Sequence, residues 1–243
     1  SVQDKVIVIT GGSGFLGTQF AEHLKGEQAK VVIFDKRGSI PVDVTNSEEV
    51  GEAVSRTVKE FGRIDALIHA AALDSVPGKS NGGDQWSPYE RFSTGLWEEE
   101  LRSNLTSAQI VTQAVAPVMM QQKSGSIIFI ASDLALIGPQ NSIYDPGKFK
   151  DIAYITSKAG ILGLMRSWAA YLGPYNVRAN AIAPGGMYRN HPEDFVKKNS
   201  ALNMLGRMAR LGEYNGPIVF LAADASSYMT GACLVVDGGR TAW

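Results

Sequence analysis

The stretch Lys5-Val-Ile-Val-Ile-Thr10, followed at once by Gly11-Gly-Ser-Gly-Phe-Leu-Gly17, decides the fold. Its first half is a short, apolar and largely β-branched run that ends at glycines, which is typical of a buried parallel strand. Residues 18–25 then place their apolar side chains at helical spacing. A strand, a glycine-rich loop and a helix in direct succession predict the opening unit of a Rossmann-type α/β sheet.

The glycine-rich loop has the pattern of a dinucleotide-binding motif. Gly12, Gly14 and Gly17 satisfy G-x-G-x-x-G between a strand and a helix, which is the context that the motif requires. Glycine allows the tight turn and lets the backbone approach a pyrophosphate at the helix N-terminus. A glycine-rich turn without a ligand is the alternative. The residues that we expect to contact the cofactor here are Gly11, Ser13, Gly14, Phe15, Leu16 and Gly17.

The second apolar run, residues 30–35, ends in a carboxylate that bears on cofactor choice. Asp35 lies 18 positions after Gly17, where it would accept hydrogen bonds from the adenosine ribose hydroxyls and repel a 2′-phosphate. This position favours NAD. Lys36 and Arg37 follow directly and could hold that phosphate instead, so NADP remains the alternative.

The remaining chain continues the alternation of short strands and helices. Residues 45–48 carry the Thr-x-x-Glu pattern of a capping box, and the helix expected after them keeps its valines on one side. The order, the short connections and the absence of a composition break predict one doubly wound α/β domain over residues 1–243, with a parallel sheet of about seven strands. Further strands are expected at residues 42–44, 64–72, 126–131, 177–183 and 233–237.

Composition narrows the class of protein. Of 243 residues, 44% are hydrophobic, and 23 basic side chains stand against 24 acidic ones, which fits one globular core and lacks the positive excess of a nucleic-acid binder. Because the sequence shows no long apolar run and no signal peptide, we expect a cytoplasmic protein without a membrane span. Cys233, expected in a buried strand, has no internal disulfide partner. The three histidines lack ligand spacing, so no metal is expected.

Three segments interrupt the regular alternation, at residues 73–95, 139–152 and 187–210. A long loop after the carboxyl end of a strand is uncommon unless it covers a site, so we expect all three to border one. The third segment is basic and amphipathic, which predicts solvated helices. An oligomer contact is the alternative for the first two segments, whose aromatic and basic residues could also line a sugar pocket. These residues are Trp86, Tyr89, Arg91 and Tyr144.

Tyr154 and Lys158 begin an apolar-periodic segment and would share one face of a helix. A neighbouring ammonium favours a phenolate and draws the pKa of a tyrosine toward neutrality, so that the tyrosine can pass a proton. The pair could also arise by coincidence. Tyr144 and Lys148 repeat the spacing, but the Pro-Gly pair between them makes a helix there improbable.

Motifs along essentially the whole chain resemble the short-chain dehydrogenase/reductase family, in its single-domain form. The resemblance implies that Tyr154 is the general acid/base and that Lys158 holds the nicotinamide ribose and lowers the pKa of the tyrosine. Ser132 would orient the substrate oxygen, and Asn104 would hold a water in a proton relay to Lys158. The motifs are, in chain order, the glycine loop, Asp35, Asn104, Ser132, Tyr154-x-x-x-Lys158 and Pro184-Gly185.

The same resemblance implies further contacts with the cofactor. Asp43 and Val44 would lie beside the adenine, and the backbone near Ala70 and Ala71 would touch the cofactor. The residues expected to border the nicotinamide are Pro184, Gly185 and Met187.

The sequence departs from the family pattern in three places. The glycine loop is spaced like that of extended, sugar-nucleotide members, yet 243 residues leave no room for their substrate domain. His69-Ala-Ala-Ala72 replaces the family's Asn-Asn-Ala-Gly, which removes an asparagine that braces the sheet. Ser132 lies 22 residues before Tyr154, where the family has about a dozen. Residues 143–151 are therefore expected to bulge over the site.

The extra residues leave two candidates for the catalytic serine. Ser142 lies 12 residues before Tyr154 and so has the family's spacing. Ser132 ends a strand, as the family's serine does, and is preferred for that reason.

The expected function is an NAD(P)-dependent oxidoreductase acting on a secondary alcohol or ketone of a sugar. A weaker resemblance, carried by residues 132–139 and 187–191, is to dehydrogenases of bacterial surface-glycan and flagellin-sugar biosynthesis. The alternatives are a sugar epimerase or dehydratase that retains its NAD, suggested by the extended-type loop, and a catalytically silent dinucleotide-binding protein. Because the family forms tetramers or dimers, we expect a homo-oligomer, most simply a homotetramer, with residues 237–243 packed across an interface.

Overall fold

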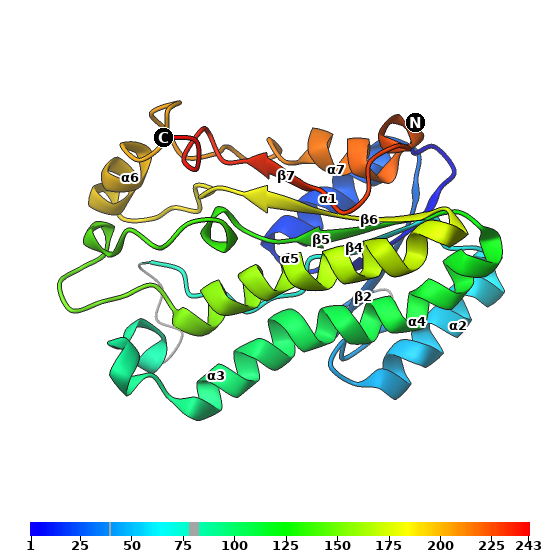
Figure 1. Ribbon diagram of the computed structural model, residues 1–243, viewed down its shortest axis with the longest axis horizontal. Coiled ribbons are helices and arrows are strands. Elements are labelled where there is room, and N and C mark those ends of the chain that lie inside the picture. The colour runs from blue at the N-terminus through cyan, green and yellow to red at the C-terminus, as the bar shows by residue number, and fades with distance from the viewer. Residues whose placement is uncertain (39, 78–82) are drawn as a thin grey trace.

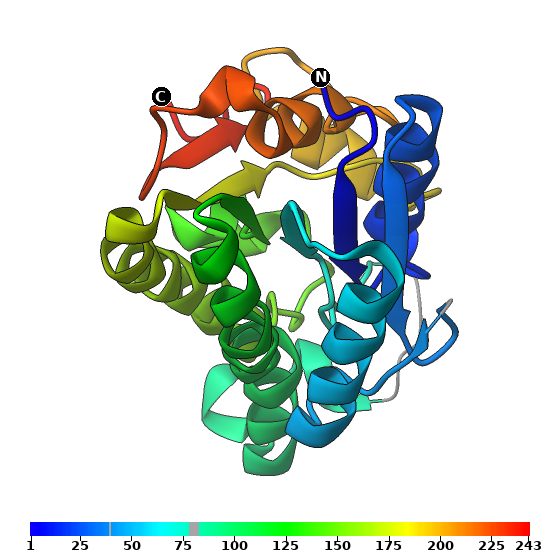
Figure 2. The same cartoon turned by 90° about the vertical axis from the view of Figure 1, so that its right-hand side faces the viewer.

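The computed structural model describes residues 1–38, 40–77 and 83–243, and these form one twisted parallel sheet between two layers of helices (Figures 1 and 2). The sheet has seven strands in the order β3-β2-β1-β4-β5-β6-β7, which confirms the predicted doubly wound Rossmann fold. The strands are β1 (Val6–Thr10), β2 (Lys30–Asp35), β3 (Ile40–Pro41), β4 (Ala66–His69), β5 (Gly125–Ile130), β6 (Val177–Pro184) and β7 (Cys233–Val236).

Helices cover both faces of the sheet. In the described residues α2, α4 and α5 pack on one face and α1 and α7 on the other, as the end-on view of Figure 2 shows. A π-helical turn, Arg102–Thr106, joins α3 to α4. The α-helices are α1 (Phe15–Gly26), α2 (Ser47–Phe61), α3 (Thr94–Leu101), α4 (Ser107–Gln122), α5 (Ile152–Leu172), α6 (Glu193–Ser200) and α7 (Asn215–Ala222).

The central strands are buried on both faces because helices cover both. In β1, Val8 contacts the apolar cluster beneath α2, α4 and α5, whereas its neighbour Ile9 contacts the cluster beneath α1 and α7. Successive strand side chains point to opposite faces, so each central strand needs an unbroken apolar run. This is why residues 5–10 read as a continuous rather than an alternating apolar stretch.

The connection from β3 to α2 differs from the prediction. The third strand is Ile40–Pro41, not residues 42–44, because Asp43 enters a turn in which its Oδ1 accepts hydrogen bonds from the N–H and hydroxyl of Thr45. The helix cap is also one residue later than expected. Asn46 accepts hydrogen bonds from the N–H groups of Glu48 and Glu49, and its side-chain amide donates to the Glu49 carboxylate. This resembles a capping box, except that the returning hydrogen bond comes from the side chain of the cap residue and not from its backbone N–H.

Other boundaries shift for local reasons. The helix expected from Trp97 to Gln121 is divided into α3 and α4 by the π-helical turn. Residues 187–210 form a single α-helix, α6, and a bridge between Met187 and Ala209, rather than several helices. Cys233 is only half buried, because β7 is an edge strand.

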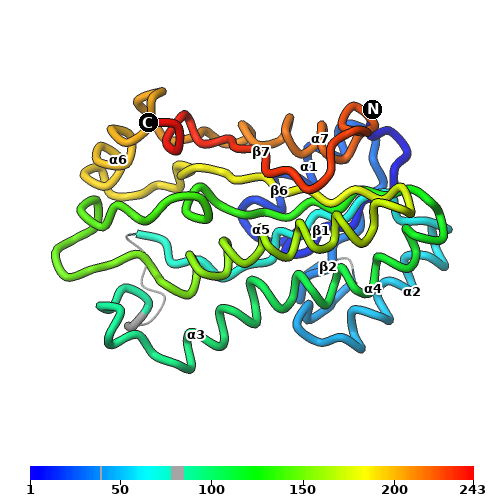
Figure 3. Tube along the Cα trace, in the orientation of Figure 1, coloured from blue at the N-terminus to red at the C-terminus, as the bar shows by residue number. Residues whose placement is uncertain are grey.

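The carboxyl ends of the strands gather the segments that matter for function. These ends point toward the left of Figure 1, where α6, the loop before α5 and the carboxyl-terminal tail also lie, and Figure 3 traces these segments along the chain. Among the described residues, no helix has the length and hydropathy that a membrane crossing needs. Residues 78–82 of the first predicted loop, with Gly78 and Gly82, lie outside the described residues.

Candidate active site

A cleft of about 670 Å³ opens at the carboxyl ends of the strands. It is lined from both sides of β1, where the chain runs first to β2 and later crosses to β4. In open α/β sheets this reversal of strand order leaves a crevice for ligands. All of the residues predicted to contact the cofactor line this cleft except Ser13.

The glycine loop forms a cradle that only glycine allows. Gly11 has a φ of +64°, and a Cβ there would lie 2.6 Å from the Ala71 Cα, whereas a Cβ on Gly17 would overlap the Gly11 carbonyl oxygen. Gly14 caps α1 without any side-chain hydrogen bond. The first-turn N–H groups of α1 therefore face the cleft without a capping side chain, which fits the pyrophosphate of a dinucleotide.

Asp35 stands at the end of β2 beside this cradle. Its Oδ2 accepts a hydrogen bond of 3.2 Å from the Ser13 N–H, and its Oδ1 accepts one of 3.0 Å from the Arg37 N–H. Lys36 pairs with Asp43 at 2.9 Å, and both residues line the cleft. That hydrogen bond, with others from Thr45, lowers the pKa of Asp43 to about 2. The carboxylate of Asp35 thus lines the cleft where an adenosine ribose would lie.

Tyr154 and Lys158 come from the first two turns of α5. Asp151 caps the helix, accepting hydrogen bonds from the Ala153 N–H at 2.9 Å and the Tyr154 N–H at 3.1 Å. The Lys158 Nζ donates to the Ile130 carbonyl at 2.7 Å and lies 5.6 Å from the centroid of the Tyr154 ring. The helical spacing therefore places both side chains on the cleft wall, as expected.

The pKa of Tyr154 departs from the expectation. Burial raises it well above the usual value and the charge of Asp74 adds to the rise, whereas a hydrogen bond with Ser132 opposes it. Desolvation disfavours the phenolate and so works against the expected lowering of this pKa by Lys158, which stays a prediction. Burial also lowers the pKa of Lys158 to about 8, so the ammonium form still predominates at neutral pH.

The two candidate serines lie in different surroundings. Ser132 is buried in the cleft wall, where its hydroxyl donates to Asp133 Oδ1 at 2.9 Å and accepts from the Leu134 N–H at 3.2 Å. Ser142 is exposed, accepts a hydrogen bond from Gln140 and does not line the cleft. Ser132 shares the cleft with Tyr154, and Ser142 does not.

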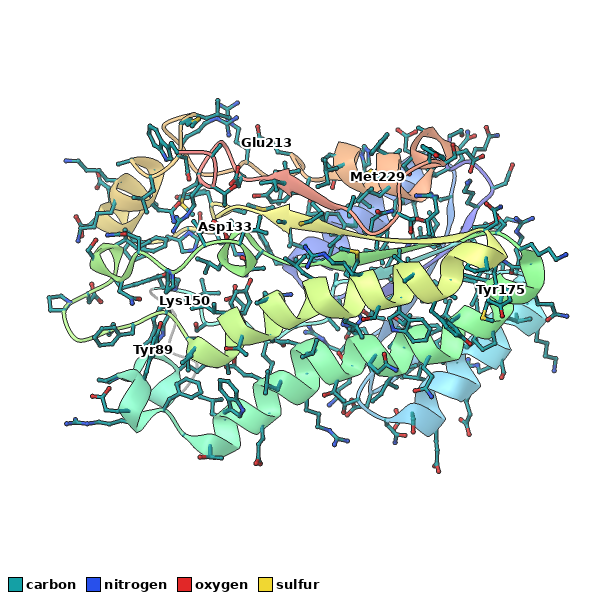
Figure 4. The ribbon with its side chains drawn as sticks, viewed as in Figure 1. Tyr89, Asp133, Lys150, Tyr175, Glu213 and Met229 are labelled. Atoms are coloured by element: carbon teal, nitrogen blue, oxygen red, sulfur yellow. The ribbon has the colours of Figure 1, made fainter. Side chains whose placement is uncertain are left out.

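The extra residues before α5 fold back onto the site. Tyr144 and Lys150 from this segment line the cleft. The Lys150 Nζ donates to Asp74 Oδ1 at 2.8 Å and to the Ser75 carbonyl at 3.1 Å, and it lies 4.4 Å from the centroid of the Tyr154 ring. Figure 4 shows Lys150 beside the start of α5. An ion pair therefore fastens the inserted segment to the loop after β4.

Asn104 lies in the π-helical turn and is fully buried. Its Oδ1 accepts from the Leu73 N–H at 2.7 Å, and its Nδ2 donates to the Leu73 carbonyl at 3.0 Å and to Ser157 at 3.3 Å. The side chain thus ties α5 to the loop after β4. Its role in a proton relay stays a prediction.

His69, which stands in place of the family's asparagine, connects two layers of the fold. Its Nδ1 lies 2.9 Å from the Thr10 hydroxyl in β1 and its Nε2 lies 3.2 Å from the Ser107 hydroxyl in α4. Burial, with a contribution from Lys158, lowers the pKa of the imidazole to about 3, so the ring is neutral. His69 therefore braces the sheet against α4, in place of the asparagine that the family has at this position.

An aromatic wall borders the cleft opposite the glycine loop. The rings of Tyr144 and Phe195 stack at 5.7 Å, and His191 lies 5.1 Å from Phe195. Trp86 packs behind Tyr144 at 5.2 Å without lining the cleft. Tyr89 and Arg91, also expected in a sugar pocket, do not line it either.

Several cleft residues escaped the sequence analysis. Asp133 directly follows Ser132, and Lys150 lies in the segment expected to bulge over the site, so their positions could have indicated them. Gly238 and Gly239 indicated a turn that could bring Arg240 back to the site. Asn199, on α6, gave no signal. In the described residues no group of three or more His, Cys, Asp or Glu side chains is placed to hold a metal. The cleft residues that were missed include Asp74, Asp133, Lys150, Asn199 and Arg240.

Known proteins resemble this chain in both sequence and fold. The family model described as enoyl-(acyl carrier protein) reductase matches residues 12–241. A 3-oxoacyl-(acyl-carrier-protein) reductase of Thermotoga maritima is 30% identical over 262 aligned residues, covering 98% of each chain. The chain belongs to the short-chain dehydrogenase/reductase family. Within this family, a protein of Rhizobium meliloti named as a probable galactose dehydrogenase is also 30% identical, covering 98% of this chain and 95% of its own.

A solved short-chain dehydrogenase has the same architecture. The enzyme of Leptospira borgpetersenii with bound NAD⁺ superposes with a TM-score of 0.86 at 27% identity, covering 98% of this chain and 93% of its own. Membership of the short-chain dehydrogenase/reductase family makes this chain an NAD(P)-dependent oxidoreductase by class. The glycine cradle and the carboxylate at the end of β2 fit a nicotinamide dinucleotide.

Proposed function

We propose that this short-chain dehydrogenase transfers hydride between nicotinamide and the secondary alcohol or ketone of a sugar or sugar derivative. The observation that carries the proposal is the convergence of Ser132, Tyr154 and Lys158 on one cleft with the glycine cradle. A proton-transfer group thus lies in the same space as a site for a hydride carrier. Because members of the family form oligomers, we also propose that this chain forms a homo-oligomer.

The residues of the cleft divide the work of oxidation. When bound, the dinucleotide supplies the hydride acceptor. For oxidation, Tyr154 must first be a phenolate, whose Oη accepts the hydroxyl proton of the substrate as hydride leaves the carbon for the nicotinamide; for reduction, the neutral phenol donates its proton to the carbonyl oxygen. Ser132 orients the substrate oxygen. Lys158 stabilises the phenolate, and Asn104 serves a relay of protons toward Lys158.

Cofactor preference follows from the end of β2. Asp35 offers its carboxylate to the ribose hydroxyls, and Lys36 is drawn to Asp43 at 2.9 Å instead of toward a 2′-phosphate. A carboxylate at this position disfavours the extra phosphate of NADP. NAD is therefore the proposed cofactor.

A sugar-like substrate is supported by two observations. The stacked rings of Tyr144 and Phe195 give the cleft an aromatic wall, which suits the apolar face of a sugar ring. A relative that covers nearly the whole chain is named as a galactose dehydrogenase. A sugar epimerase that retains its NAD would release no free NADH. Stoichiometric release of NADH during turnover would therefore exclude that alternative.

The experiment combines a substrate screen with two serine variants. The purified protein is given NAD or NADP and a panel of sugars and sugar derivatives, and the absorbance of the reduced cofactor is followed. Ser132→Ala should lower kcat by roughly a hundredfold or more, because it removes a hydrogen bond to the reacting oxygen. Ser142→Ala should leave turnover unchanged. If Ser142→Ala abolished turnover and Ser132→Ala did not, the assignment would be wrong.

A further inference from the structure

The carboxyl-terminal tail delivers a buried arginine to the substrate side of the cleft. Gly238 and Gly239 both have positive φ, and the tail turns back as Asp237 accepts hydrogen bonds from the N–H groups of Gly239 and Thr241. Arg240, at 7% exposure, lines the cleft as a result. The tail thus contributes Arg240 to its own chain's cleft, and its packing across a subunit interface stays a prediction.

The guanidinium of Arg240 has donors to spare. Its Nε lies 3.2 Å from Asp133 Oδ2, yet this enclosed nitrogen makes no hydrogen bond. No described residue accepts a hydrogen bond from any of its nitrogens, although a guanidinium carries five N–H donors. Burying a cation with unused donors is costly unless a ligand satisfies them. The planar fork of an arginine matches the oxygens of a carboxylate or phosphate.

Asn199 supplies a second unpaired polar group to the same cleft. It is 5% exposed, and its Oδ1 is enclosed without a hydrogen-bond partner. The amide packs against Gly186, where an added Cβ would lie 3.1 Å from Oδ1. An amide oxygen can accept only, so its natural partner is a hydroxyl or amine of a ligand.

The other cations near Tyr154 are already engaged. Lys150 uses its three donors on Asp74 and on the hydroxyl and carbonyl of Ser75. Arg189 lies 4.5 Å from the centroid of the Phe15 ring and 3.9 Å from Asp74 Oδ2, so it is held between the glycine loop and the loop after β4. Arg240 is the cation whose position and unused donors suit the substrate.

We propose that Arg240 and Asn199 recognise a substrate that carries an oxyanion, either carboxylate or phosphate, together with several hydroxyl groups. Arg240 would hold the oxyanion and Asn199 would accept from a hydroxyl. Asp133 bridges Arg240 and Ser132, accepting from the Ser132 hydroxyl at 2.9 Å, so the oxyanion would lie close to the reacting alcohol. This inference rests on the proposed function and narrows its substrate to acidic sugar derivatives.

The test compares matched ligands that differ in charge. With NADH bound, the affinities of D-gluconate and D-gluconamide are measured by calorimetry, and the same is done for D-glucose 6-phosphate and D-glucose. The acidic member of at least one pair should bind about tenfold to a hundredfold more tightly, as expected for charge-assisted hydrogen bonds. The pair that shows the advantage tells carboxylate from phosphate. Equal affinity within both pairs, or no binding by any member, overturns the inference.

Variants then assign the advantage to Arg240. Arg240→Gln should abolish the preference for the acidic member, and Arg240→Lys should retain part of it while keeping a charge opposite Asp133. Asn199→Leu should weaken both members of a pair equally, by about threefold to tenfold for one lost hydrogen bond. Arg56→Gln, on the exposed side of α2, is the matched control and should leave the preference unchanged.

The controls separate this inference from the proposed function. If Arg240→Gln kept the preference, or if Arg56→Gln removed it, Arg240 would not be the anchor. Should Arg240→Gln fail to fold, Arg240→Lys and the wild-type ligand pairs still decide. Failure of the proposed function would look different, because then no sugar or sugar derivative, charged or neutral, would support the reduction of NAD.

Discussion

The two ends of the cleft are built in different ways. At the dinucleotide end one contiguous segment, residues 10–17, presents backbone N–H groups and the space left by glycines. At the substrate end, charged side chains meet from distant segments, as in the pairs Asp74–Lys150 and Asp133–Arg240. The first end suits a ligand that the whole family shares, whereas the second can change with a few substitutions. Function should therefore fail differently when each end is altered.

The largest effect is expected at Tyr154. Tyr154→Phe removes the hydroxyl that exchanges the proton, so kcat should fall by about a hundredfold to ten-thousandfold. The affinity for NADH, measured by fluorescence titration, should stay within about twofold because the dinucleotide end keeps its backbone contacts.

Tyr171→Phe is the matched control for Tyr154→Phe. Tyr171 lies on the same helix and is 58% exposed, so its loss should leave kcat unchanged. Unchanged turnover in Tyr154→Phe would contradict the proposed proton transfer.

The dinucleotide end should be sensitive to a single methyl group. In Gly17→Ala the new Cβ meets the Gly11 carbonyl oxygen and the Gly12 Cα, so the loop must move. Overpacking of this kind costs up to about 3 kcal/mol of the free energy of unfolding. NADH affinity should fall as well, whereas Tyr154→Phe leaves it intact.

Gly51→Ala provides the comparison for Gly17→Ala. Gly51 lies inside α2, and an added Cβ meets nothing within 4 Å. This change should raise the free energy of unfolding by about 0.5–1 kcal/mol, because alanine favours a helix. Urea denaturation of Gly17→Ala and Gly51→Ala measures the difference in their free energies of unfolding. Equal stability would show that the glycine loop accommodates a Cβ without strain.

Sequence predicted the dinucleotide end well because its signals are local. The strand, the glycine spacing and the helix lie within a few residues of one another, and together they favour a dinucleotide-binding loop over a glycine-rich turn without a ligand. The parallel sheet was also predictable from local sequence, because its central strands are unbroken apolar runs. The errors in this half were also local, since Asp43 and Asn46 form turns and caps that compete with a third strand and an earlier cap.

The substrate end could be predicted only in part. Tyr154 and Lys158 were found because helical spacing placed them together, but Lys150 meets Asp74 across 76 positions of sequence. Arg240 reaches Asp133 only because the tail turns back. The pKa of Tyr154 likewise depends on burial, which the spacing of two residues does not reveal. Contacts between residues so far apart in sequence depend on the tertiary structure, so local sequence patterns do not predict them.

The ion pair that fastens the inserted segment gives a third, smaller effect. Lys150→Met leaves Asp74 with only the more distant Arg189, at 3.9 Å, and releases the segment from the loop after β4. We expect a loss of about 1–2 kcal/mol in stability, since Asp74 is partly solvated. KM for the substrate should rise about tenfold, because the wall carrying Tyr144 loosens. NADH affinity should not change.

Lys148→Met, in the same segment, is the control for Lys150→Met. Lys148 pairs with Asp145 at 3.4 Å on the surface, and such pairs contribute little. Both stability and KM should stay near the wild-type values. If KM rose equally in the two variants, the effect would come from altering any part of the segment, and the Lys150–Asp74 ion pair would have no special role.

The smallest effect concerns a buried pair of carboxyl groups beneath the substrate end. Glu100 on α3 is fully buried against Asp151, the cap of α5. Burial, followed by the interaction with Asp151, raises the pKa of Glu100 to about 9. The Glu100 Oε2 and Asp151 Oδ2 have no other hydrogen-bond partner among the described residues, which fits one proton shared between them.

A pKa raised on folding sets the sign of the pH dependence. The folded protein binds the proton of Glu100 more tightly than the unfolded chain, where the usual value is 4.5. Its contribution to stability is therefore fully present below that value and is lost as the pH rises toward about 9. Glu100→Gln cannot ionise and should keep its amide against Asp151, so its stability should be flatter across this range and exceed the wild type above it.

Urea denaturation at several pH values measures this difference, with Glu98→Gln, exposed on the same helix, as the control. Because Asp151 also holds the Tyr154 N–H, ionised Glu100 should loosen the start of α5. The wild type should then lose kcat/KM above about pH 9 while its NADH affinity persists. If NADH affinity fell in parallel with kcat/KM, the two ends of the cleft would be mechanically coupled, and the independence inferred from their construction would not hold.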